Sequence, residues 1–132
     1  MNAPAPQPGY AASLSLLALC VRDARCADLA LAQGLRPEHV YPGLPRAVWQ
    51  LLARLRHAGA WPDLVTLVER VPELAATPEG QREAETFLRA LPGSPASPRS
   101  LAVYIADCQA GARYRAAESA ASEILEIGRA HV

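Results

Sequence analysis

The sequence predicts an all-α domain: a compact multi-helix head followed by one long helix. Half of the 132 residues are apolar (51%) but only 5% are aromatic, and Ala and Leu dominate. Small and unbranched side chains lose little rotamer freedom in a helix. Apolar residues also recur at helical spacing, and no segment alternates as a strand would. A chain of this length has room for a single core.

Charge and cysteine content exclude several classes of function. The thirteen basic residues, all Arg, balance thirteen acidic ones. A net charge of zero argues against binding of nucleic acid or anionic lipid through overall positive charge. Without Lys there is no phosphate-loop lysine and no Schiff base. Three cysteines without C-x-x-C spacing indicate reduced thiols and a cytoplasmic protein. Their spacing fits no structural zinc pattern.

The first elements are a tail and two helices. Residues 1–9 are rich in proline and small residues, which predicts a flexible tail. A helix is expected over residues 12–22. Its apolar positions are Leu14, Leu17, Ala18 and Val21. A second helix should cover residues 26–33 and end at Gly34, followed by a helical turn over residues 36–39.

The clearest helix starts at Pro45 and ends at Gly59. Its apolar positions are Val48, Leu51, Leu52 and Leu55. Asp63 is predicted to cap the next helix, residues 64–71, because its carboxylate can accept hydrogen bonds from the free amides there. Acid–base chemistry at Asp63 is the less favoured interpretation.

The last two helices are separated by proline and glycine. Thr77-Pro78 starts a helix that runs to Leu91. Residues 93–98 predict a turn-forming linker. Ser97 would cap the longest helix, with a proline in its first position, and this helix should continue to about Ile124.

These elements divide the chain into a tail (1–9), a head (10–93), and a linker with a long helix (94–125). The segment 126–132 has a different explanation. Its sequence, Glu-Ile-Gly-Arg-Ala-His-Val, is the in-frame translation of GAG ATC GGA AGA GCA CAC GTC, the start of a widely used sequencing-library adapter. We therefore expect an assembly artefact that cut the natural reading frame near Leu125.

This order of elements, with its short motifs, resembles the N-terminal domain of DnaB-type replicative helicases. The motifs are Leu35 to Tyr41, Gly59 followed by Asp63-Leu64-Val65-Thr66-Leu67, Phe87-Leu88 with Leu91, and Tyr104, Arg115 and Glu123-Ile124 on the final helix. The match is collinear over roughly residues 12–125. It departs from the family in the first helix, which does not have the usual glutamate and glycines, and at Val40, which replaces the Phe before Tyr41.

The resemblance implies a non-catalytic collar domain that mediates ring assembly and primase docking in DNA replication. The long helix would be the first arm of a helical hairpin that pairs with a neighbouring subunit, in a hexamer built as a trimer of dimers. The implied partners are a DnaG-type primase and a helicase loader, in the cytoplasm near the nucleoid. ATP and magnesium are implied only for the C-terminal ATPase domain, which would also contact DNA. We expect no cofactor, metal, catalytic residue or membrane contact in these residues.

The long helix carries the predicted interface with a subunit or primase. The candidates are Leu101, Tyr104, Ile105, Cys108, Ala112, Arg115, Ala120 and Ile124. Ordinary packing of this face against the head is the alternative. Among the aromatic residues, Trp49 and Phe87 are expected in the core, whereas Tyr41 and Trp61 lie at turns and could face a partner.

Two other functions stay open. One is a stand-alone adaptor or inhibitor that binds a helicase or primase. The other is a small helical nucleic-acid binder, which predicts salt-dependent DNA affinity. For the collar domain, we expect the head to fold but the chain to assemble poorly without the second hairpin arm.

Overall fold

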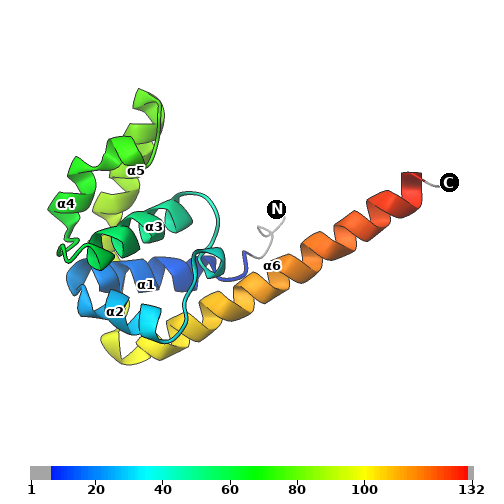
Figure 1. Ribbon diagram of the computed structural model, residues 1–132, viewed down its shortest axis with the longest axis horizontal. Coiled ribbons are helices and arrows are strands. Elements are labelled where there is room, and N and C mark those ends of the chain that lie inside the picture. The colour runs from blue at the N-terminus through cyan, green and yellow to red at the C-terminus, as the bar shows by residue number, and fades with distance from the viewer. Residues whose placement is uncertain (1–6, 131–132) are drawn as a thin grey trace.

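The computed structural model describes residues 7–130, and this part of the chain contains six α-helices and no strand (Figure 1). The all-α fold class is confirmed. The helices are α1 (Tyr10–Arg22), α2 (Arg25–Ala32), α3 (Leu44–His57), α4 (Leu64–Glu69), α5 (Pro78–Ala90) and α6 (Leu101–Ala130). The first five form the head, and α6 runs along it and then projects away (Figure 1).

The central helix of the head is α1. It packs against α2, α3 and α6, and every residue from Leu16 to Val21 is buried. A helix covered on all sides needs apolar residues around its whole circumference, so the predicted stripe marked only part of its buried surface. The helix starts at Tyr10, earlier than the expected residue 12, because Gly9 turns the chain there with φ 85°.

Two of the predicted glycine stops are present. Gly34 and Gly59 follow α2 and α3, and both have φ 83°. This left-handed conformation suits glycine, which has no Cβ to clash with the following carbonyl. The predicted turn between these helices is a 3-10 helix over Pro37–His39 with proline in its first turn.

Side-chain caps start the next two helices. An Asp63 carboxylate oxygen accepts a hydrogen bond from the Thr66 amide at 2.9 Å, and the Thr77 hydroxyl accepts one from the Gly80 amide at 3.0 Å. The predicted helix 64–71 is shorter than expected, because α4 ends at Glu69 and a 3-10 turn follows. Pro72 lies in that turn, and it has no amide hydrogen to continue an α-helix.

The linker between α5 and α6 is held against the head by Arg22. Its guanidinium donates to the carbonyl oxygens of Ala96 at 2.9 Å and Pro92 at 3.1 Å, and also to that of Ser94. Three backbone acceptors on one guanidinium fix the path of the linker, and thereby the position at which α6 begins.

The start of α6 differs from the sequence prediction. The Ser97 side chain makes no capping hydrogen bond, because the 3-10 turn Pro98–Ser100 separates it from the helix. The Ser97 amide instead donates to the Tyr104 hydroxyl at 3.2 Å. The helix also continues to Ala130, beyond the expected end near Ile124.

Parts of two predictions lie outside the described residues. These are residues 1–6 of the expected tail and residues 131–132 of the expected artefact. Residues 7–9 are described and form a turn, in which the Gln7 carbonyl accepts a hydrogen bond from the Tyr10 amide at 3.0 Å.

Candidate interaction surface

The first half of α6 belongs to the core of the head. Leu101, Ile105 and Cys108, three of the predicted interface residues, are 7%, 2% and 0% exposed. The helix packs along α1, and the Cys108 sulfur lies 3.6 Å from the Ser13 hydroxyl of α1. These three side chains already contact the chain itself, so the alternative interpretation, packing against the head, applies to them.

Three further candidates are half-buried at the edge of this contact: Tyr104, Ala112 and Arg115. The Tyr104 hydroxyl accepts from the Ser97 amide. The Arg115 guanidinium donates to the Pro8 carbonyl at 2.5 Å. Both polar groups therefore bind other segments of the same chain.

The remaining two candidates, Ala120 and Ile124, lie on a different part of α6. Residues 116–130 are all exposed, and we call this segment the free arm. It includes large apolar side chains that no other described residue covers: Ile124 is 69% exposed and Leu125 is 63% exposed. Ile127 is also 60% exposed, but it lies in the segment expected to be an artefact. Uncovered side chains of this size, grouped within one turn of helix, are typical of a surface that binds a partner.

The structure also identifies an exposed stripe on α6, of which only Ile124 was predicted from the sequence as an interface residue. From Ala110 onward, residues on the outer side of α6 repeat at alternating spacings of four and three, as in a coiled coil, and Val103 lies two turns of helix before them. The members are Val103, Ala110, Tyr114, Ala117, Ala121 and Ile124, and all of them are exposed. The signal was present in the sequence, but the buried residues Leu101, Ile105 and Cys108 repeat with the same helical period on the opposite face of α6. We call these six residues the outer stripe.

The three cysteines are buried and free. Burial raises the pKa of the Cys20 thiol far above its ordinary value, and burial also raises the pKa values of Cys108 and Cys26. A thiol that stays protonated is a poor nucleophile and a poor metal ligand. Among residues 7–130, no group of three His, Cys, Asp or Glu side chains is placed to hold a metal ion.

Asp63 acts as the predicted helix cap. The hydrogen bond from the Thr66 amide lowers the pKa of its carboxyl group. The carboxylate thus stabilises the first turn of α4, and its hydrogen bond is to the backbone.

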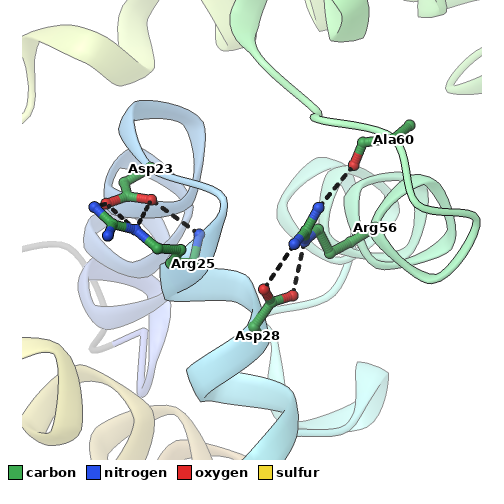
Figure 2. A network of polar contacts seen from close by, with 5 residues as sticks. All are labelled: Asp23, Arg25, Asp28, Arg56 and Ala60. Atoms are coloured by element: carbon green, nitrogen blue, oxygen red, sulfur yellow. Dashed lines mark hydrogen bonds and ion pairs between the residues drawn. The ribbon is translucent and has the colours of Figure 1, made fainter.

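A polar network joins α2 to the end of α3 (Figure 2). Two nitrogens of Arg56 donate to the two carboxylate oxygens of Asp28, at 2.8 and 3.0 Å, and a third donates to the Ala60 carbonyl at 3.3 Å. These hydrogen bonds lower the pKa of Asp28. A second pair, Asp23 with Arg25, lies nearby and is confined to the start of α2 (Figure 2).

The aromatic residues divide largely as expected. Trp49 is fully buried, and Phe87 packs against the core. Trp61 is 52% exposed and lies over the Arg56 guanidinium, with 5.1 Å between the ring centroid and the guanidinium carbon. Tyr41 is half-buried, and its ring is 5.2 Å from the guanidinium carbon of Arg115.

Within residues 7–130, no helix combines the length and the apolar character needed to cross a bilayer. Comparison with family models, curated proteins and solved structures found no match to this chain.

Proposed function

We propose that this chain is the non-catalytic N-terminal collar domain of a DnaB-type replicative helicase, with neighbouring subunits and a DnaG-type primase as its partners. The observation that carries the proposal is the free arm. Ile124 and Leu125, both in the free arm, are each more than three-fifths exposed. Burial of such apolar area is the main driving force of protein association. No cofactor is required in these residues, since ATP and magnesium would bind the C-terminal domain of the parent helicase.

The order of the elements supports the proposal. A buried first helix, a turn at residues 37–39, a helix capped by Asp63 and a long last helix follow one another in the order that the resemblance implies. This agreement concerns local structure over most of the described chain, and it is independent of the exposure of the free arm.

The outer stripe gives the proposed contact its geometry. Alternating steps of three and four residues keep one face of a helix against a partner helix. Ala117 and Ala121, in the first half of the free arm, leave room for close approach, while Tyr114 and Ile124 lie on either side of them. A second helix is therefore the partner structure that fits this face.

Binding to primase tests the proposed function. The chain is mixed with the helicase-binding domain of a DnaG-type primase and followed by sedimentation velocity. We expect a joint boundary for the two proteins. Binding to an intact DnaB-type hexamer, without binding to primase, would instead favour the adaptor function. Binding to neither would contradict both.

Self-association tests the role of the free arm. We expect weak, concentration-dependent association that Ile124→Glu abolishes, because a charge would be buried at the contact. Val65→Glu is the matched control, since Val65 is 66% exposed on α4 in the head. Equal effects of the two variants would contradict the role of the free arm, and a stable hexamer of this chain alone would contradict the expected poor assembly.

A further inference from the structure

Three segments distant in the sequence meet where α6 leaves the head. They are residues 8–9, the segment 38–41 that follows α2, and residues 111–115 of α6. From this meeting point onward, every residue of the helix is exposed. The junction is therefore the last place at which the head can hold α6.

Arg115 is the side chain that joins the three segments. One guanidinium nitrogen donates to the Pro8 carbonyl at 2.5 Å, and the other lies 3.5 Å from the Glu38 carbonyl oxygen. The guanidinium carbon lies 5.2 Å from the centroid of the Tyr41 ring. That ring in turn meets Tyr10 edge to face, with centroids 5.0 Å apart. Hydrogen bonds from a charged donor and cation–π contacts are each stronger when partly shielded from water, as here.

A glycine pair brings residues 8–9 onto the helix one turn before Arg115. A Cβ added at Gly111 would lie 2.7 Å from the Gly9 Cα and 2.8 Å from the Pro8 carbonyl carbon. Gly9 itself has φ 85°, which L side chains rarely adopt. Glycine in the middle of a helix is normally destabilising, so the close backbone crossing accounts for Gly111.

We infer that Gly9, Gly111 and Arg115 form a clamp that binds residues 8–9 across α6 and sets where the free arm begins. With the clamp closed, α6 is held by the head as far as Arg115. With the clamp open, residues 7–9 are released, and the last packed turn of α6 loses its cover. The exposed part of the helix then lengthens by about one turn. This inference concerns the junction in a single chain and does not depend on which partner covers the free arm.

Hydrogen–deuterium exchange of the monomeric chain at low concentration tests the clamp. Arg115→Met keeps most of the aliphatic stem and removes the donors and the charge. Exchange should become roughly tenfold faster or more in the amides of residues 9–13 and 110–116, because the variant removes the hydrogen bonds from a charged donor that tie these segments together. Arg113→Met is the matched control, since Arg113 is exposed on the same helix, and it should change neither segment.

A second variant covers the case in which Arg115→Met does not fold. Gly111→Ala disturbs the same crossing from the helix side and should accelerate exchange in the same two segments. The helix α3 serves as the internal reference and should keep its protection in both variants. Unchanged exchange at residues 9–13, or acceleration spread equally over α3, would overturn the clamp.

Discussion

The two halves of α6 share a regular helical backbone and an alanine-rich composition, yet they have opposite environments. In residues 101–115 one face is buried against α1, whereas residues 116–130 are exposed on all sides. The isoleucine side chains of the two halves also differ in their burial. Ile105 is 2% exposed and fills the core, while Ile124 is 69% exposed in the free arm. The comparison teaches that one helix can serve as a core element at one end and as a candidate binding surface at the other.

The sharpest test of this difference deletes the same atoms in each half. Ile105→Ala should lower the free energy of unfolding by about 2–5 kcal/mol, because it removes buried methyl groups and leaves a cavity. Ile124→Ala should change it by less than about 0.5 kcal/mol, as is usual for an exposed site. Urea denaturation followed by circular dichroism, at a concentration where the chain is monomeric, measures both. Similar losses in the two variants would mean that the free arm is packed in solution.

Replacing one glycine in each half of α6 should give the next largest difference in stability. Gly111→Ala should lower the free energy of unfolding. The new methyl group would collide with Gly9, and moving the backbone to relieve that collision costs about 1–3 kcal/mol. This cost is larger than the stability that alanine gains over glycine through its higher helix propensity. Gly128→Ala meets no atom within 4 Å and should raise the stability by up to about 1 kcal/mol. The melting temperatures of the two variants, compared with that of the original chain, test both expectations. A more stable Gly111→Ala variant would show that residues 8–9 do not press on the helix in solution.

Acidic pH should weaken the head through its ion pairs. Hydrogen bonds from Arg56 lower the pKa of Asp28 in the folded chain. The pair therefore contributes stability above the ordinary aspartate pKa of about 3.9, and this contribution is lost as the pH falls through the lower folded value. The effect should be small, because the pair is partly open to solvent.

The measurement is the melting temperature of the head between neutral pH and about pH 3. Asp28→Asn should make the melting temperature fall less between neutral pH and about pH 3 than it does in the original chain. Asp107→Asn, on the exposed side of α6, should leave the dependence as in the original chain. If Asp28→Asn and the original chain lose the same stability on acidification, the Asp28–Arg56 pair does not stabilise the head.

Local structure followed closely from local sequence. Asp63 caps α4 as predicted because the capping oxygen and its amide partner are only three residues apart. Gly34 and Gly59 end their helices because the left-handed conformation depends on a single residue. The split after Glu69 was missed, although Pro72 is visible in the sequence, because the apolar spacing continues across it.

The candidate surface could be predicted only in part. Leu101, Ile105 and Cys108 were assigned to an interface because they form a regular stripe, but periodicity does not tell what covers a stripe. Gly111 was visible as an isolated glycine in a long helical pattern, a signal of close packing. Its partner, Gly9, lies about a hundred residues away, so no local pattern could have paired them.

The sequence by itself determined an all-α chain with a capped α4, a turn at residues 37–39 and a long final helix, since these depend on residues within a few positions of each other. Only the tertiary structure decided which face of α6 is buried and where burial stops at Arg115. The physical reason is that two stripes on α6 have the same helical period, and α1, together with the crossing of Gly9 over Gly111, covers one of them and leaves the other in water.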